Sequence, residues 1–249
     1  MGRGSSGIGA GGGVGGSRMV QTADLDHSAA LQEKLKKEED RTRDYKREQM
    51  TVYDENGNEI IHRGGGKGAV EYTISEAQQF FYGATITHNH PAGDERGGIS
   101  GTFSVADVET FRYGLKEMRA SGAEGTYVLR NKNYNNRQAD RSMDFYRAYA
   151  DFNQNQTFGS VSDIKMAQAK AAKTKIGRQY NSEIERASRL FTRGDREAAS
   201  RLYQHAEINY KTGYKHQIKR YLYENMNSTT SGWLKTNAEK YGFEYILTK

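Results

Sequence analysis

Two histidines and an aspartate are the side chains of this chain whose types and spacing best fit metal chemistry. His88 and His90 flank one asparagine in Thr-His-Asn-His-Pro, and Asp107 ends the later stretch Ser-Val-Ala-Asp. Side chains alternate sides along an extended segment, so histidines at i and i+2 face the same way and both rings reach one ion. A catalytic zinc site commonly has three protein ligands and one position for water. The sequence therefore predicts a zinc site made of His88, His90 and Asp107.

These residues also have structural interpretations. A single histidine is usually structural or solvated, but this pair follows the apolar run 84–86 and precedes the only proline of the chain, which favours metal binding. Ser104 begins a Ser-x-x-Asp pattern, which is typical of a helix cap, and we expect it to cap a helix from Val105 to Ala120. A capping serine can still turn its hydroxyl towards the site, so the two roles are compatible.

The spacing H-x-H-P followed by S-x-x-D resembles the motif of the JAMM (JAB/MPN) metalloproteases. Thr-His-Asn-His-Pro-Ala-Gly is closest to the RadC-type branch and to the JAB-like domain at the C-terminus of some phage head-morphogenesis proteins. The resemblance covers about residues 48–130, and a weaker similarity is present in the last strand. It implies a zinc hydrolase of peptide or isopeptide bonds, with His88, His90 and Asp107 as ligands and Ser104 as the residue that stabilises the oxyanion. Thirteen residues separate His90 from Ser104, more than is usual in the family, and the polar, glycine-rich insert is expected to be a surface loop.

The resemblance also implies a glutamate upstream of the histidines as general base. In the family the glutamate lies on a first strand, after a helix and before a hairpin, a second helix and the histidine strand. The same order is predicted here from a charged helical run at 27–46, a strand at 48–53, an Asn-Gly turn and a strand at 59–63. This order favours Glu48, whereas Glu59 and Glu71 remain alternatives because both lie on predicted strands before the histidines.

The remaining pattern predicts an α/β fold, a mixed sheet flanked by helices, and the resemblance implies that this fold is of the JAMM/cytidine-deaminase-like kind. Apolar residues at helical spacing predict a helix over 74–82, which is followed by the histidine strand at 84–87. Val108, Phe111, Leu115 and Met118 would line one face of the helix that begins at Val105, and a strand at 125–130 follows a turn. The expected order is strand, strand, helix, strand, helix, strand.

A basic helical arm is predicted to be inserted in this core. Residues 142–228 are rich in Ala, Lys, Arg, Glu and Gln and contain no proline, which is typical of long exposed helices. Runs at 182–191 and 196–210, joined by a glycine turn, predict a helical hairpin. Residues 229–249 predict a short helix, a glycine stop and an alternating strand that returns to the sheet. The metal-binding core then comprises residues 23–141, preceded by a Gly/Ser-rich tail at 1–22 that we expect to be disordered.

Composition limits the classes of function. The 249-residue chain has no cysteine, so disulfides and thiolate ligands are excluded, and no apolar run is long enough for a membrane span. The N-terminus lacks the apolar core of a signal peptide, so we expect a protein of the host cytoplasm or of a phage virion. The net charge of +6 is concentrated in the basic helices, where such a surface could follow nucleic acid or an acidic protein, although a solvated helix face is the more common explanation.

Two functions of different class fit these features. In the first, the chain is a zinc hydrolase of the JAMM type that acts on a protein or peptide substrate and is phage-encoded or phage-associated. In the second, it is a non-catalytic phage head or accessory module with phage structural proteins as partners, or a nucleic-acid-associated RadC-like protein, with a vestigial metal site. The helix-hairpin-helix expected in RadC proteins is not visible in the sequence. The feature of the sequence that distinguishes the two functions is the glutamate base, for which Glu48, Glu59 and Glu71 are the candidates.

Overall fold

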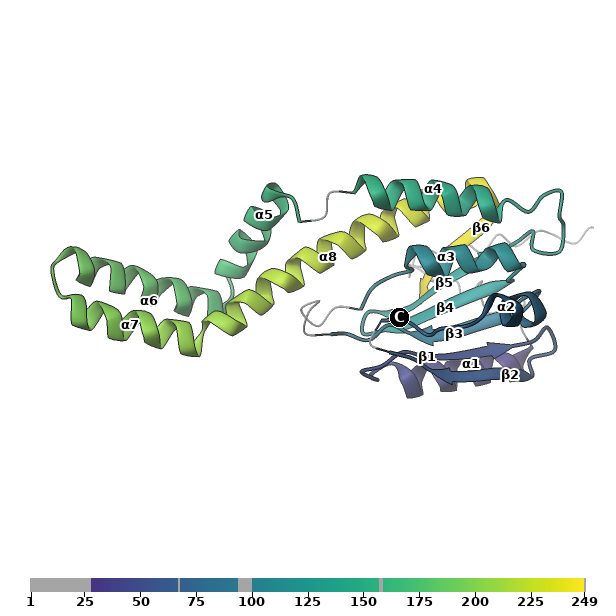
Figure 1. The fold of residues 1–249 in the computed structure, drawn as a ribbon, viewed down its shortest axis with the longest axis horizontal. Helices are drawn as coiled ribbons and strands as arrows, with labels where there is room; N and C mark the ends of the chain where they lie inside the picture. The colour runs from purple at the N-terminus through teal and green to yellow at the C-terminus, as the bar shows by residue number, and fades with distance from the viewer. Residues whose placement is uncertain (1–27, 67, 94–99, 157–158, 249) are drawn as a thin grey trace, which may run out of the picture.

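The protein forms a six-stranded mixed sheet with helices on both faces and a long helical arm (Figure 1). The computed structural model describes residues 28–66, 68–93, 100–156 and 159–248. The strands are β1 (Gln49–Tyr53), β2 (Glu59–Gly64), β3 (Thr85–Asn89), β4 (Glu117–Gly122), β5 (Gly125–Asn131) and β6 (Phe243–Thr248). They are ordered β2-β1-β3-β4-β5-β6, and only the β3–β4 pair is parallel. The α/β class and the mixed pairing predicted from the sequence are confirmed.

Up to the histidine strand, the chain follows the predicted order closely. Helix α1 (Ala29–Thr42) is capped by Ser28, and the β1–β2 hairpin turns at Gly57, whose φ of 77° suits glycine. Helix α2 (Ile74–Phe80) begins with a capping box between Thr73 and Glu76. β3 then pairs antiparallel with β1, which places the end of the histidine strand beside the beginning of β1.

One face of the sheet carries the apolar core. Met50, Val52, Ile86, Met118 and Leu129 occupy this face at alternate strand positions. They pack against Phe81 after α2, Val108 of α3 (Val105–Thr110), Phe145 and Tyr149 of α4 (Ser142–Asn155), and Leu234 near the end of the long helix α8 (Lys211–Asn237). At roughly 25 cal/mol per Å² of apolar surface removed from water, this cluster is the main source of stability of the core.

The other face is covered by α1 and holds a buried network of charges. Arg119 contacts Glu39 of α1 at 2.5 Å and Glu117 at 3.2 Å, and Arg130 contacts Glu117 at 2.9 Å. Both guanidinium groups therefore have carboxylate partners, as buried charges require. These charged pairs lie at alternate positions of β4 and β5, on the side opposite the apolar core.

The prediction of one helix from Val105 to Ala120 is wrong. Helix α3 ends at Thr110, a 3-10 turn follows at Phe111–Tyr113, and Gly114 with a φ of 80° ends the helical segment. Residues 117–122 are instead strand β4. The sequence suggested a helix because Leu115 and Met118 fit helical spacing, and because Glu117 and Arg119, although buried, look like the solvated face of an amphipathic helix.

The C-terminal half forms an insertion between β5 and β6. Helices α5 (Val161–Ala172), α6 (Lys175–Thr192) and α7 (Arg196–Asn209) form the arm with the first part of α8, extending away from the sheet in Figure 1. The predicted hairpin is confirmed as α6 and α7. Ala187 of α6 and Ala206 of α7 are buried, whereas Phe191 near the end of α6 is 61% exposed. α8 runs without a break through the boundary expected between residues 228 and 229.

The end of the chain returns to the sheet. After α8, a 3-10 turn (Ala238–Tyr241) and Gly242 with a φ of 80° lead into β6, which pairs antiparallel with β5. The strand predicted from the alternating pattern at 243–247 is thus confirmed. The tail at 1–22 and residues 94–99 of the polar insert lie outside the described residues. Within the described part of the chain, no helix is long and apolar enough to cross a membrane.

Candidate metal centre

The two histidines lie at the end of β3 with their rings side by side. His88 is on the apolar face of the sheet, in register with Met50 of β1 and Ala120 of β4. His90 follows the strand, and its backbone N–H donates to the Ser121 carbonyl at 2.8 Å, which extends the parallel ladder. Both residues are 6% exposed, and their Nε2 atoms are 2.8 Å apart. The prediction that the i, i+2 spacing turns both rings the same way is confirmed.

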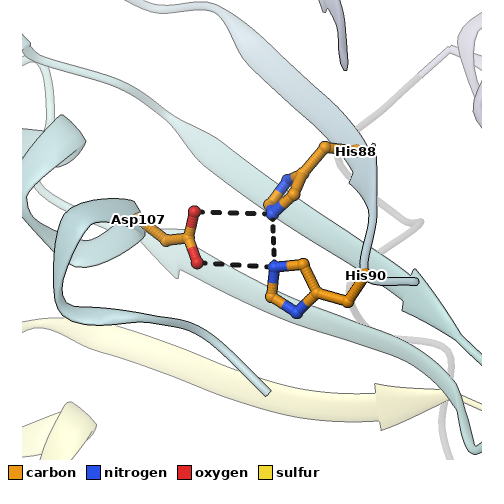
Figure 2. A group of neighbouring side chains, drawn as sticks. All are labelled: His88, His90 and Asp107. Carbon is orange, nitrogen blue, oxygen red and sulfur yellow. Dashed lines mark hydrogen bonds and ion pairs between the residues drawn. The ribbon is translucent and has the colours of Figure 1, made fainter. Parts of the chain in front are cut away.

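Asp107 completes the cluster from the first turn of α3. Its Oδ1 lies 3.4 Å from His88 Nε2 and its Oδ2 lies 3.5 Å from His90 Nε2, so the carboxylate faces both rings (Figure 2). A capping box holds it there, because Oδ2 accepts from the Ser104 backbone N–H at 2.6 Å and Ser104 Oγ accepts from the Asp107 N–H at 3.2 Å. The predicted cap is therefore present, and it orients the carboxylate.

The outer nitrogen of the His90 ring is held by a backbone carbonyl. His90 Nδ1 donates to the Gly101 carbonyl at 2.8 Å. A carbonyl only accepts, so the proton of the neutral His90 ring lies on Nδ1, and its Nε2 presents a lone pair towards His88 Nε2 at 2.8 Å. This is the tautomer that metal-binding histidines adopt, with one ring nitrogen donating to a carbonyl and the other available to a metal.

The electrostatics of the cluster also favour a cation. Burial lowers the pKa of His88 to about 4, whereas the nearby Asp107 carboxylate outweighs burial at His90 and raises the pKa of that ring. Burial would raise the pKa of Asp107, but the two imidazoles and the Ser104 N–H hold it well below its usual range. The carboxylate is therefore ionised, and the site accommodates one positive charge.

The three side chains fit a small divalent metal. Their ligand atoms all lie within 4.8 Å of one another. In a tetrahedral zinc site, ligand atoms about 2.0 Å from the metal lie roughly 3.3 Å apart. The two histidine–aspartate distances of 3.4 and 3.5 Å agree with this value, and the Nε2–Nε2 distance of 2.8 Å requires a small opening of the rings. Two imidazoles and one carboxylate are a donor set that zinc accepts.

Glu48 is the candidate base that the structure brings to this cluster. It is 7% exposed and lines two cavities, one with His90 and Ser104 and one with His88 and Asp107. Met50 pairs with His88, so Glu48, two residues earlier, lies alongside His90 where β1 begins. Its carboxylate also contributes to the raised pKa of His90.

The other two candidate bases lie elsewhere. Glu59 begins β2 in register with Tyr53, at the far end of β1 from Glu48, and its side chain is exposed. Glu71 is also exposed, and it lines a different cavity together with Arg63. Neither lines the two cavities that contain the histidines.

Asn89 was missed as a site residue from the sequence. Lying between the histidines, it points to the opposite side of the strand, where its Oδ1 accepts from the Gln49 N–H at 2.6 Å. Its Nδ2 donates to the Arg47 carbonyl at 3.2 Å. The asparagine thus ties the residues on both sides of Glu48 to the histidine strand. The alternation of side chains indicates the side to which Asn89 points, but nothing local identifies its partners.

A second set of missed residues supports the loop at 100–104, which carries the Gly101 carbonyl and Ser104. Asn227 Oδ1 of α8 accepts from the Thr102 N–H at 2.8 Å. The Tyr149 hydroxyl of α4 donates to the Phe103 carbonyl at 2.5 Å, and the Tyr245 hydroxyl lies 3.1 Å from Thr102 Oγ1. All three supporting residues come from the insertion or from β6. Their separation from the loop, 46 residues or more, leaves no sequence signal.

Comparison of the chain with protein-family models, with curated proteins and with solved structures gave no match.

Proposed function

We propose that this protein is a zinc-dependent hydrolase of peptide or isopeptide bonds of the JAMM type. The observation that carries the proposal is that Glu48 lines the same cavities as His88, His90 and Asp107, so that a candidate base adjoins a complete set of metal ligands. The order of elements, with Glu48 before the first strand, the histidines at the end of β3 and Ser-x-x-Asp at the start of α3, supports the motif resemblance. The phage association implied by the resemblance is part of the proposal.

In this mechanism different residues of the chain bind the metal, transfer the proton and stabilise the oxyanion. Zinc held by His88, His90 and Asp107 would polarise the carbonyl of the bond to be cut and acidify a coordinated water. Glu48 accepts the proton of the attacking water and returns it to the leaving amine. Ser104 Oγ already accepts the cap bond from the Asp107 N–H, so its own proton remains free to donate to the oxyanion.

Elemental analysis of the purified 249-residue chain tests whether it binds the metal. We expect close to one zinc per chain, and we expect His88→Ala and Asp107→Ala to lose it. His62→Ala is the matched control, because His62 is on β2 and contacts Thr51 and Glu38 instead of the cluster. A chain that contains no metal after gentle purification would refute the assignment.

Cleavage of quenched peptide and isopeptide libraries tests the chemistry. Glu48→Gln should keep zinc, because this residue is not among the three ligands, and should lower turnover by about 10²- to 10⁴-fold. Glu59→Gln and Glu71→Gln serve as controls and should leave turnover unchanged. A loss in either control, with Glu48→Gln fully active, would show that the base is a different glutamate.

The charge of the arm favours a second candidate function. Residues 161–224 contain fourteen lysines and arginines against seven aspartates and glutamates, an excess suited to an anionic partner. In this alternative the chain is a non-catalytic phage accessory or nucleic-acid-associated module in which zinc only stabilises the core. A zinc-loaded chain that cleaves no peptide, and in which Glu48→Gln has no effect on any measured property, would favour this alternative.

A further inference from the structure

The larger cavity at the metal cluster is built from two parts of the chain. It has a volume of about 390 Å³ and adjoins Glu48 and His90 on the side of the sheet. Helix α8 supplies Tyr223, Met226 and Thr230, whose spacing of three and four residues places them on one face of the helix. One wall of the cavity beside the metal cluster is therefore formed by the insertion.

This wall is held in a fixed position. Asn227, next to Met226, accepts from the Thr102 N–H and donates to the Tyr127 hydroxyl, both at 2.8 Å. The cavity thus has a wall whose geometry is set before any ligand binds, which lowers the entropy cost of binding. Its volume is within the range of roughly 300–1,000 Å³ of small-ligand pockets, so it admits a short chain segment and not a folded domain.

The chemistry of the lining points to an uncharged ligand. Among the described residues that line the cavity there is no lysine or arginine, and Glu48 supplies their one carboxylate. Phosphate groups are bound mainly by lysine and arginine, which this described lining does not supply. Phe103, Tyr223 and Met226 instead offer apolar surface, while the backbone and side-chain amides near Thr102 and Asn153 suit the polar groups of a peptide. The lining differs in this respect from the basic outer part of the arm.

We propose that this cavity binds an uncharged peptide segment whose apolar side chain packs between Phe103 and the Tyr223–Met226 face of α8, next to the bond cut at the metal cluster. The statement about cleavage rests on the proposed function, whereas the binding itself does not. The insertion would then determine which peptide binds, and the residues at the sheet would carry out the hydrolysis. Tyr223 and Met226 are the residues to which the preference is assigned.

Fluorescence anisotropy on the purified zinc-loaded chain tests the proposal without relying on cleavage. The probes are three labelled peptides that differ only in a central leucine, glutamate or lysine, together with a single-stranded oligonucleotide, each read before turnover. We expect the leucine peptide to bind about tenfold or more tightly than the charged peptides, because a charge entering apolar surroundings is penalised. The oligonucleotide should not displace it.

Two variants assign the preference to α8. Met226→Arg should weaken binding of the leucine peptide about tenfold and improve binding of the glutamate peptide, because it places a cation in the cavity. Met166→Arg is the matched control, since Met166 is a half-exposed methionine on α5 outside the cavity. Tyr223→Ala, with Tyr203→Ala of α7 as its control, provides an independent variant that introduces no charge.

The outcomes separate this inference from the proposed hydrolase. Equal affinity for the three peptides, unchanged binding in both α8 variants, or displacement by the oligonucleotide would overturn the inference, and the last result would make nucleic acid the ligand of the cavity. Selective binding of the leucine peptide without any cleavage would support the cavity assignment and refute the hydrolase. Cleavage without selectivity would support the hydrolase and refute the cavity assignment.

Discussion

At the scale of single residues, the two histidines of the cluster differ although they lie two positions apart on the same strand. Both are buried, but the charge-balancing effect of Asp107 is sufficient to raise the pKa only of His90, while burial dominates at His88 and lowers its pKa to about 4. In the metal-free cluster a proton is therefore held by His90 in preference to His88. A metal must displace that proton before it binds.

The pH dependence of zinc affinity should reveal this asymmetry. His90, with its raised pKa, is protonated below that value, so affinity falls as pH is lowered from neutrality. His88 stays neutral down to about pH 4 and Asp107 stays ionised, so a single proton competes. We expect zinc affinity, measured by competition with a chelating dye between pH 5 and 6, to fall about tenfold per pH unit. A fall close to a hundredfold per unit would show that both rings titrate together.

The three candidate ligands could be predicted from the sequence, whereas the residues that orient them could not. His88 and His90 share a strand, and Asp107 is marked by a capping pattern, so short-range spacing contains the information. Glu48 could be ranked above Glu59 and Glu71 only from the order of elements. The Gly101 carbonyl that fixes the tautomer of His90 carries no sequence signal, because every residue has a backbone carbonyl.

At the scale of elements, the loop at 100–104 connects the metal cluster to the insertion. It carries the carbonyl that orients His90 and the serine that orients Asp107, and it is held by Asn227, Tyr149 and Tyr245. A net gain of about 1 kcal/mol per hydrogen bond is small. Together, however, the three contacts hold the loop that orients two of the candidate ligands, which a metal site needs to be positioned closely.

Replacing Asn227 tests this connection. Asn227→Ala removes the acceptor of the Thr102 N–H and the donor to the Tyr127 hydroxyl, so we expect the free energy of unfolding to fall by about 1–3 kcal/mol. Zinc affinity should fall as well, because the loop that orients His90 loses its support. Urea denaturation and zinc titration measure the two effects. Asn225→Ala is the control, since Asn225 is exposed on the same helix. A loss of stability with unchanged zinc affinity would show that the loop keeps its geometry without α8.

Most of the elements were predictable, and β4 shows why one was not. The alternation at 117–121 places Glu117 and Arg119 on one side and Met118 and Ala120 on the other. Sequence rules assign charged residues to solvent. Here, however, Glu117 is buried in a pair with Arg130, and Arg119 is buried in a pair with Glu39. The ion-pair partners that stabilise these buried charges lie up to 80 residues away in the sequence, so a local pattern does not indicate them.

At the scale of the whole molecule, the basic charge is concentrated in the arm, away from the metal cluster. Residues 161–224 have a net charge of +7, while the complete chain has +6, so the remainder is close to neutral. The cavity at the metal cluster lies where this arm joins the core, and the described residues of its lining include no lysine or arginine. Attraction of an anionic partner and recognition at the site are therefore expected to use different surfaces of the insertion.

Binding of the arm to nucleic acid should accordingly be electrostatic and independent of sequence. Each phosphate contact that releases a counterion contributes about 0.9 to the slope of log affinity against log salt on duplex DNA, so affinity should fall steeply between about 50 and 200 mM salt. Replacing Lys215 and Lys219, which are exposed one turn apart on α8, with glutamine should reduce that slope by up to about 2. Lys36→Gln with Lys37→Gln on α1 is the matched control. Affinity that depends on DNA sequence, or that does not change with salt, would mean that groups other than these lysines make the contact.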